Sequence, residues 1–469
     1  MAPPSDILAQ IHDDDIKLVD LRMTDLLGRL RHVTLDASGV DREILEHGIL
    51  MDGSALPGWR DITMADLLLE PDLATCHADP FAAQPTLALT CNSAEPATGF
   101  GYERDPRSIA KRAASYLQTK GLADTVLIGI EVHFYLFDDT RIEIGPTKVA
   151  SSVTAHEHHI EGGEAFRTGN PGHRPPARAA YMIQSPADHM ADMRSEMVTI
   201  LRELGFERLR HEHGLGPNQG RITCAPEPLL ESADRLQLLK YTVQQVAASY
   251  GKSATFMPKP LAGQRGNSLR VHLSLRTDKH YHFAGNGYAD LSPSCLNFIA
   301  GIITHAQALN ALTNPTTNSY RRLMAGQDEP VVLSYGAHNR SAAIRIPYAA
   351  HPRHKRIEIR FPDAAANPYL TYAALLMAGL DGVNKKLDPG DAMDRNLYDI
   401  MPEDLADLPN CARNLDEALT ALANDQEFLL EGDVMTPDMI ESYIRLRREE
   451  LDRLATTPHP LEFEMYYSS

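Results

Sequence analysis

Apolar and polar residues alternate along residues 125–137, TVLIGIEVHFYLF, in the pattern typical of a β-strand. The alternation places Glu131, His133 and Tyr135 on one face and the apolar side chains between them on the other. We therefore predict a half-buried strand that presents three polar groups to a cleft.

Short strand-like runs dominate the first hundred residues, including two strands within residues 17–35 that are joined by a turn near Gly28. A helix is then predicted to begin at Pro106, with Asp105 as its N-cap and Gly121 as its stop. We place a domain boundary here, which gives domains of residues 1–102 and 103–469.

Strand-like and helical patterns alternate in the larger domain, and the segment 140–180, rich in His, Gly and Pro, is interpreted as loop. The predicted fold class is α+β, with a small β-rich domain followed by an α/β domain whose sheet is flanked by helices. The strands expected after residue 137 are 221–224, 269–275, 342–347 and 356–361, and the helices are 233–250, 296–312, 415–430 and 436–454.

Composition narrows the class of protein. The 469 residues are 43% hydrophobic and carry a formal net charge of -18 without a basic run, which disfavours nucleic acid and anionic membranes as partners. Five scattered cysteines and no long apolar run or leader-like N-terminus favour reduced thiols in the cytoplasm. We therefore expect a cytoplasmic protein that spans no membrane.

A set of motifs extends along the whole chain in a fixed order, and through it the sequence resembles type I bacterial glutamine synthetase. The resemblance rests on DGSALPGW (52–59), RDPRSIAKR (104–112), ATFMPKP (254–260), NPTTNSY (314–320), NRSAAIRIP (339–347), NPYL (367–370) and TPHPLEFEMYY (457–467). Such an ordered series is far more specific than a single short motif.

The resemblance implies a β-grasp domain on a larger catalytic domain, assembled as two stacked hexameric rings with each active site between neighbouring subunits. It further implies binding of ATP, glutamate, ammonium and two or three magnesium or manganese ions. In that reaction the side-chain carboxylate of glutamate is phosphorylated and ammonia displaces phosphate. Metals are needed there because negative charge builds on the transferring phosphoryl group.

The metal positions implied by the family are altered in this chain. His133, Gly214 and Arg221 stand where one site has three glutamates, and Arg270 replaces the histidine of the second site beside Glu131 and Glu358. Arginine remains protonated and ligates no cation, so we predict that no metal is bound and that Glu131 and Glu358 are remnants paired with arginine.

Two other arrangements would rebuild a metal site. Glu212 shares strand parity with Gly214 and would fill a vacant ligand position if the register were shifted. A transition-metal site made of His133, His211 and His213 is the other arrangement, since imidazole is a common ligand for such ions.

The ammonium pocket implied by the family is also changed. Asp52 and Tyr181 match it, whereas Ala55 and Gly214 stand at the serine and glutamate positions. Because both replacements remove polar groups and add room, we expect a bulkier or less charged group there.

Further family positions carry over by alignment. Gly266, His272, Arg322, Arg340 and Arg360 correspond to substrate-binding residues, Arg345 and Arg356 to nucleotide contacts, Asp328 or Glu329 to the flap glutamate, and Tyr398 to the tyrosine that is adenylylated. Guanidinium groups suit carboxylates and phosphates because they donate two parallel hydrogen bonds. With Asp52, Glu131, His133, Tyr181, Arg270, Glu358 and Asp328 as catalytic candidates, these residues define the predicted site.

Three functional hypotheses follow. The favoured one is a diverged, metal-independent enzyme that acts on a small carboxylate or amine compound, with Arg221 and Arg270 as electrostatic stabilisers and His133 as the best proton carrier. The others are a noncatalytic paralogue that binds a metabolite or a partner synthetase, and an ATP-dependent ligase that forms glutamine or a γ-glutamyl amide. No cofactor is expected, except ATP and magnesium under the ligase hypothesis, and the partner expected is a homo-oligomer, a dodecamer of two rings.

Overall fold

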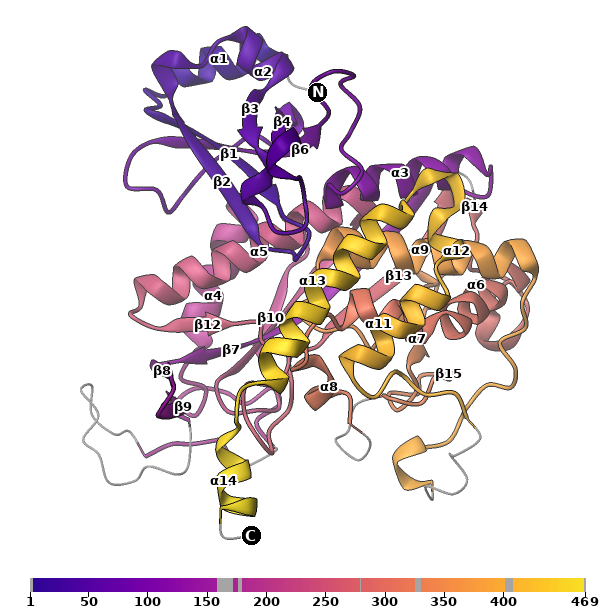
Figure 1. The fold of residues 1–469 in the computed structure, drawn as a ribbon. Coiled ribbons are helices and arrows are strands. Elements are labelled where there is room, and N and C mark those ends of the chain that lie inside the picture. The colour runs from indigo at the N-terminus through magenta and orange to yellow at the C-terminus, as the bar shows by residue number, and fades with distance from the viewer. Residues whose placement is uncertain are drawn as a thin grey trace.

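The computed structural model describes residues 3–157, 172–175, 179–278, 280–324, 330–400 and 408–467. In Figure 1 the N-terminal part of the chain forms a separate lobe at the top, and the remaining helices and strands form the larger body below it. Apolar side chains of both parts belong to one continuous core.

The N-terminal lobe is built on a six-stranded sheet with the order β2-β1-β6-β4-β3, to which β5 is added beside β6. Strands β1 and β2 form the predicted hairpin, and Gly28 in its turn has a φ of +85°, a conformation that side chains with a Cβ rarely adopt. The elements are α1 (Pro4–Asp13), β1 (Leu18–Thr24), β2 (Leu30–Asp36), α2 (Arg42–His47), β3 (Ile49–Asp52), β4 (Asp66–Pro71), β5 (His77–Ala78) and β6 (Thr86–Ala94).

The larger body contains a nine-stranded sheet with the order β10-β11-β7-β13-β17-β16-β15, in which β12 also pairs with β7 and β14 with β13. The strands are β7 (Thr125–Phe137), β10 (Arg210–His213), β11 (Gln219–Pro228), β12 (Ser253–Thr255), β13 (Leu269–Thr277), β14 (His280–Tyr281), β15 (Tyr335–Ala337), β16 (Ile344–Ile346) and β17 (Ile357–Ile359). Every strand predicted for this domain from the sequence is present.

Helices α3 and α5 pack against strand β7 of this sheet, and α9 packs in turn against α3 and α5 (Figure 1). Helix α3 starts at Pro106, and the Asp105 side chain accepts a hydrogen bond from the backbone N–H of Ser108, as the sequence predicts. The helices are α3 (Pro106–Thr119), α4 (Ala191–Glu203), α5 (Leu229–Ser249), α6 (Pro293–Thr304), α7 (Ala306–Thr313), α8 (Ser319–Arg322), α9 (Pro368–Lys385), α11 (Leu415–Asn424), α12 (Glu427–Leu430), α13 (Pro437–Ala455) and α14 (Pro460–Tyr466).

Four local predictions are corrected by the structure. Strand β7 is buried on both faces rather than half-buried, because neighbouring strands flank it and α3 and α5 pack against it. The segment expected to be loop contains an antiparallel hairpin, β8 (Asp139–Gly145) and β9 (Lys148–Thr154). The helices predicted at 296–312 and 415–430 are each divided into two, α6 and α7 with a 74° bend and α11 and α12.

Among the described residues, no single helix is both long and apolar enough to cross a bilayer, and only the bent pair α6 and α7 passes that test when its two helices are combined. Both helices are largely buried, as core helices are.

Contacts between the two domains hold the small lobe in place. The Arg107 guanidinium on α3 donates to Asp72 at 2.8 Å in the lobe and to Asp234 at 2.7 Å on α5. The Gln237 amide of α5 donates to Thr24 Oγ1 at 2.8 Å. Both contacts use side chains whose polar atoms would otherwise be buried without partners.

Candidate active site

The strand register of the large sheet brings acidic and basic side chains together at its centre. Arg270 on β13 is the direct cross-strand partner of Glu131 on β7, and Arg345 on β16 is the partner of Glu358 on β17. Cross-strand partners on one face of a sheet lie close enough for their side chains to interact. The register therefore fixes which charges meet.

Arginines surround both glutamates. Glu131 Oε1 accepts a hydrogen bond from Arg221 Nη1 at 3.0 Å, and Arg270 Nε forms an ion pair with the same oxygen at 3.0 Å. Glu358 Oε1 accepts from Arg270 Nη1 at 3.2 Å and from Arg360 Nη1 at 2.5 Å, and its Oε2 accepts from Arg345 Nη1 at 2.6 Å. Arg270 thus connects the two carboxylates.

A second set of contacts extends the cluster towards the edge strand β10. Arg221 pairs with Glu212, its cross-strand partner, and donates to the Tyr181 hydroxyl at 3.2 Å. Its guanidinium also lies over the Tyr181 ring, 5.2 Å from the centroid. Arg210 reaches Glu212 at 3.5 Å from the outer side.

A cavity of about 560 Å³ opens over this cluster. Its walls carry far more positive than negative charge, since the two acidic residues that line it, Glu131 and Glu358, are both paired with arginine. The basic lining residues are Arg208, Arg210, Arg221, Arg270, Arg340, Arg345, Arg353, Lys355, Arg356 and Arg360. The cavity is built to attract an anion.

The titration of the central groups follows from burial and from the arginines. Burial alone would raise the pKa of Glu131, but the hydrogen bond with His133 and the charges of Arg270 and Arg221 outweigh it and hold the pKa well below its usual range. Burial lowers the pKa of His272 to about 4, so this lining imidazole is neutral near pH 7.

His133 differs from the role predicted for it. Its Nε2 lies 3.3 Å from Glu131 Oε1, but the side chain is buried beside that carboxylate and is not among the residues that line the cavity. Burial lowers its pKa, and the neighbouring arginines lower it further against the effect of Glu131. His133 therefore supports Glu131 rather than facing a ligand directly.

The sequence-predicted residues divide into two groups. The cavity is lined by Glu131, Tyr181, Arg270, His272, Arg340, Arg345, Arg356, Glu358 and Arg360, all of which the sequence singled out. Asp52, His133, Gly266 and Arg322 do not line it, and Asp328, like Glu329, lies outside the described residues. Arg208, Arg210, Arg353 and Lys355 also line the cavity but were not predicted as site residues. No family role was matched to any of the four, although Arg353 and Lys355 stand in the segment RHKR (353–356) with Arg356.

Three of the residues away from the cavity have clear local roles. Arg322 is fully buried and donates to the backbone carbonyls of residues 360–362. Gly266 accepts a hydrogen bond from the Gln219 amide, 3.0 Å away, through its backbone carbonyl. Asp52 is exposed on the N-terminal lobe, where it caps a short turn by accepting from Ser54 N at 2.8 Å.

Gly214 does not add room to the site, contrary to the sequence-based expectation. A Cβ at this position would lie 2.6 Å from Gln219 Oε1, so the space beside the glycine is already filled. The Gln219 side chain is held there by hydrogen bonds to Gly266 O and Asn267 Oδ1.

The three histidines proposed as an alternative metal site are not brought together as one. The described group whose ligand atoms lie within 4.8 Å of one another consists of Glu157, Asp188 and His213. His213 contacts Glu157 Oε2 and Gly214 O, each at 2.8 Å, while Asp188 accepts from Arg194 at 2.5 Å. Burial opposes a charged imidazole, but the hydrogen bond with Glu157 prevails and raises the pKa of His213, as expected of an ion pair.

Comparison with known proteins decides the family. Residues 15–96 match the β-grasp domain of glutamine synthetase and residues 103–466 match its catalytic domain. The chain belongs to the glutamine synthetase family. It is 47% identical to glutamine synthetase of Rhizobium meliloti over all of both chains, and 48% identical over 99% of both chains to a 3-hydroxylaminophenol mutase of Cupriavidus pinatubonensis.

Solved structures of a glutamine synthetase and of GmaS share the fold. The chain superposes on Plasmodium falciparum glutamine synthetase with a TM-score of 0.91 at 26% identity, covering 100% of this chain and 99% of the other. Apo GmaS gives a TM-score of 0.82 at 27% identity, covering 99% and 100%. The predicted fold, a β-grasp domain followed by a mixed catalytic domain, is thereby confirmed.

The central residues fit a divalent cation of the glutamine synthetase kind poorly. Both oxygens of Glu358 already accept hydrogen bonds from guanidinium groups, as does Glu131 Oε1 from Arg221, and Arg270 forms ion pairs with both carboxylates. A doubly charged ion 4 Å from one guanidinium would meet a repulsion of roughly 8 kcal/mol at an effective dielectric constant near 20. Hard cations instead require several free oxygen ligands.

Proposed function

We propose that this member of the glutamine synthetase family is a diverged enzyme that acts on a small carboxylate or amine compound without a divalent cation. Arg270 and Arg221 supply fixed positive charge where a metal ion would otherwise act. The observation that carries this proposal is the bridge from Arg270 to both Glu131 and Glu358.

In this proposal the cavity binds its substrate through an anionic group. Arg340 and Arg356 line the outer part of the cavity and receive a carboxylate or phosphate, which suits the two parallel donors of a guanidinium group. Arg270 and Arg221 stabilise negative charge that develops nearer the glutamates, and because they are already held in place, little reorganisation is needed. His272 stays neutral and donates or accepts one hydrogen bond.

Amine chemistry is supported by Tyr181 and by one of the relatives. The Tyr181 ring, 41% exposed and covered on one side by Arg221, offers a flat surface to an aromatic or amine-bearing substrate. A relative of nearly equal similarity is named a 3-hydroxylaminophenol mutase, a name that describes a rearrangement of one substrate. A rearrangement converts one substrate into an isomer, so its overall equation includes no phosphoryl donor such as ATP.

The second candidate function is an ATP-dependent ligase, which the names of most of the similar relatives favour. One assay separates the two candidates: formation of γ-glutamyl hydroxamate from glutamate, hydroxylamine and ATP, with magnesium or manganese. Under the metal-independent proposal no product forms, and calorimetry detects no stoichiometric binding of manganese. ATP-dependent product together with stoichiometric metal binding would overturn it.

Measuring substrate turnover by the purified protein distinguishes the enzyme hypotheses from a noncatalytic role. If hydroxylamino aromatics or other small amines are converted and Arg270→His abolishes the conversion, the chain is an enzyme.

We also propose that the chain assembles with copies of itself into two stacked hexameric rings. Apolar side chains exposed on α14, such as Phe463 at 58% and Leu461 at 52%, support such an assembly.

A further inference from the structure

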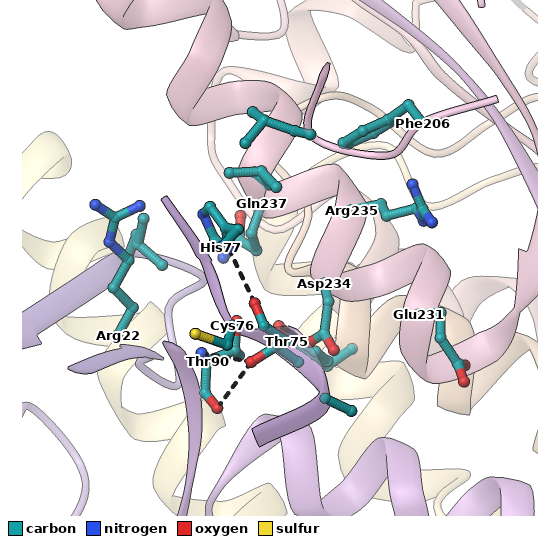
Figure 2. A pocket seen from close by; sticks show the side chains of 15 residues that line it. Arg22, Thr75, Cys76, His77, Thr90, Phe206, Glu231, Asp234, Arg235 and Gln237 are labelled. Atoms are coloured by element: carbon teal, nitrogen blue, oxygen red, sulfur yellow. Dashed lines mark hydrogen bonds between the residues drawn. The ribbon is translucent and has the colours of Figure 1, made fainter. Parts of the chain in front are cut away.

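A groove separates the N-terminal lobe from α5, on a side of the molecule that shares no lining residue with the arginine-lined cavity. Two cavities lie along it, of about 220 Å³ and about 730 Å³, and both touch Arg22, Leu30 and Gln237. Figure 2 shows the smaller one, where side chains of the lobe such as Cys76 and His77 face Asp234 and Gln237 of α5. The larger one falls in the size range of small-molecule sites.

The basic residues that line the larger cavity are of two kinds: those paired with carboxylates in ion pairs and those without such a pair among the residues that the structure describes. Arg22 is neutralised by Asp20 at 2.7 Å and by Asp79, and Arg31 by Asp25 at 2.9 Å. Lys240 and Arg29 also line the cavity, and no carboxylate that lines it is paired with either of them. The charge of the buried Asp363 acts on Lys240 from outside the cavity lining. These two cations leave the cavity with excess positive charge.

Lys240 is the more unusual of the two. Its half-buried side chain projects from α5, and Nζ donates to the backbone carbonyl of Ala366 at 3.3 Å and lies 5.7 Å from the centroid of the Phe256 ring. Burial lowers its pKa to about 8. A cation in such surroundings is stabilised when an anion binds next to it.

The remaining walls suit an apolar body attached to that anion. Leu18 and Leu30 come from the lobe, and Phe256, Met257 and Ala364 from the catalytic domain. The amides of Gln244 and Gln245 lie at the same cavity and offer further hydrogen bonds. An amphipathic carboxylate would satisfy both parts of this lining.

We propose that the larger cavity is a binding site for a small organic carboxylate with an apolar body, whose charged end is held by Lys240 and Arg29. The smaller cavity is less suitable, because its lining includes the carboxylates of Glu231 and Asp234 and its volume is less than a third as large. This inference is independent of the reaction proposed for the arginine-lined cavity.

Occupancy of the site couples the two domains. The hairpin turn of the lobe is docked beside Lys240 through hydrogen bonds from Gln237 to Gly28 O at 3.2 Å and from Asn367 to Asp25 O at 3.2 Å. A ligand that touches both walls binds only while the lobe is docked, so it stabilises that arrangement.

The test uses hexanoate and benzoate as probes, with inorganic phosphate for comparison, in thermal-shift and calorimetric titrations of the full chain. We expect the two carboxylates to raise the melting temperature of the wild-type protein and phosphate to raise it less. Lys240→Met should abolish the shift, and because it removes a poorly compensated cation, it should not lower the melting temperature of the unliganded protein. Lys240→Arg should keep the shift.

Three controls make the result specific. Arg29→Gln, at an exposed position, should weaken binding of hexanoate about tenfold, as expected for loss of one charged hydrogen bond. Lys385→Met removes a surface ion pair with Asp381 on α9, outside the cavity, and should leave the carboxylate-induced shift unchanged. Arg270→His should retain the response because it alters the other cavity. Absence of a wild-type shift at 10 mM hexanoate, or an unchanged shift in Lys240→Met, would overturn the proposal.

Discussion

Arg270 stands directly opposite Glu131 across the antiparallel pair of β13 and β7, and its Nε lies 3.0 Å from the glutamate Oε1. The same guanidinium reaches Glu358 on the other neighbouring strand at 3.2 Å. One side chain thus contacts two carboxylates that come from different strands, and Arg221, Arg345 and Arg360 supply further positive charge to them.

Replacement of Arg270 tests its role as a stabiliser of anions. Arg270→His removes the fixed charge, so binding of glutamate or phosphate in the arginine-lined cavity should weaken by about tenfold to a hundredfold, the range for a hydrogen bond to a charged group. Calorimetry measures the change. Arg270→Lys should retain part of the affinity, because the charge remains while the two parallel donors are lost. Equal affinities of all three proteins would contradict the role.

Restoring acidic ligands should restore metal binding. The triple variant His133→Glu, Arg221→Glu, Arg270→His exchanges two cations for carboxylate and imidazole ligands around Glu131 and Glu358. Manganese titration followed by electron paramagnetic resonance should show binding in this variant and none of comparable strength in the wild-type chain. Tight stoichiometric binding by the wild-type chain would show that the arginines do not exclude the ion.

Glu358 should be a major contributor to stability, since it accepts from Arg270, Arg345 and Arg360 and is 3% exposed. Glu358→Gln leaves three guanidinium groups undercompensated and should lower the free energy of unfolding by about 3 to 5 kcal/mol. Urea denaturation measures the loss.

The matched control for Glu358 is the exposed pair of Arg42 and Glu46 on α2, four residues apart. Glu46→Gln should cost no more than about 0.5 kcal/mol, because solvent screens such a pair. A loss of similar size at both glutamates would mean that burial of the Glu358 cluster contributes little.

His305 should make stability depend on pH. Its two ring nitrogens lie 2.9 Å from Asp381 and 2.8 Å from Asp425, and although burial opposes the charge, these contacts raise its pKa. The stabilisation is therefore complete below the ordinary histidine pKa of about 6.5 and is lost as the pH rises through the raised value.

The comparison of wild type with His305→Asn isolates this effect. The difference between their melting temperatures should be largest near pH 6 and should shrink towards pH 9. A difference that stays constant across this range would assign His305 a packing role alone, for example through its stacking on Phe428 at 4.0 Å.

Assembly is checked by light scattering on the purified chain. Two stacked rings of six predict a mass twelve times that of the 51.8 kDa chain. Removal of residues 458–469 should reduce the mass if the exposed apolar side chains of α14 are buried between copies. A monomeric wild-type protein would refute this part of the proposal.

The fold could be predicted from the sequence because the local signals for caps, turns and strands agreed with the domain order that the family motifs imply. The cap at Asp105, the turn at Gly28 and the strand at residues 125–137 all agree with the structure, although that strand is buried on both faces, and the family motifs supplied the domain order. The division of α6 from α7 was not predictable, since both halves have the same apolar periodicity and only tertiary packing sets the bend at His305.

Part of the site could be predicted from the sequence, and the rest could not because it depends on tertiary packing. The pairing of Arg270 with Glu131 and Glu358 was expected from the resemblance, which places all three at one metal site of the family, and from their opposite charges. The filling of space beside Gly214 by Gln219 depends on a rotamer and on hydrogen bonds to residues about fifty positions away, which no local pattern records. The same holds for His133, whose burial behind Glu131 separates it from the cavity.

The register of β7, β11, β13 and β17 has a consequence for how such a site changes over time. The contacts of Arg270, Arg221 and Arg345 with the two central glutamates lie between direct or diagonal cross-strand neighbours. Exchanging a ligand for an arginine at these positions therefore requires a new side chain within the same strand register. A lineage could pass between ion-dependent and arginine-dependent chemistry through a few codon changes on one strand register.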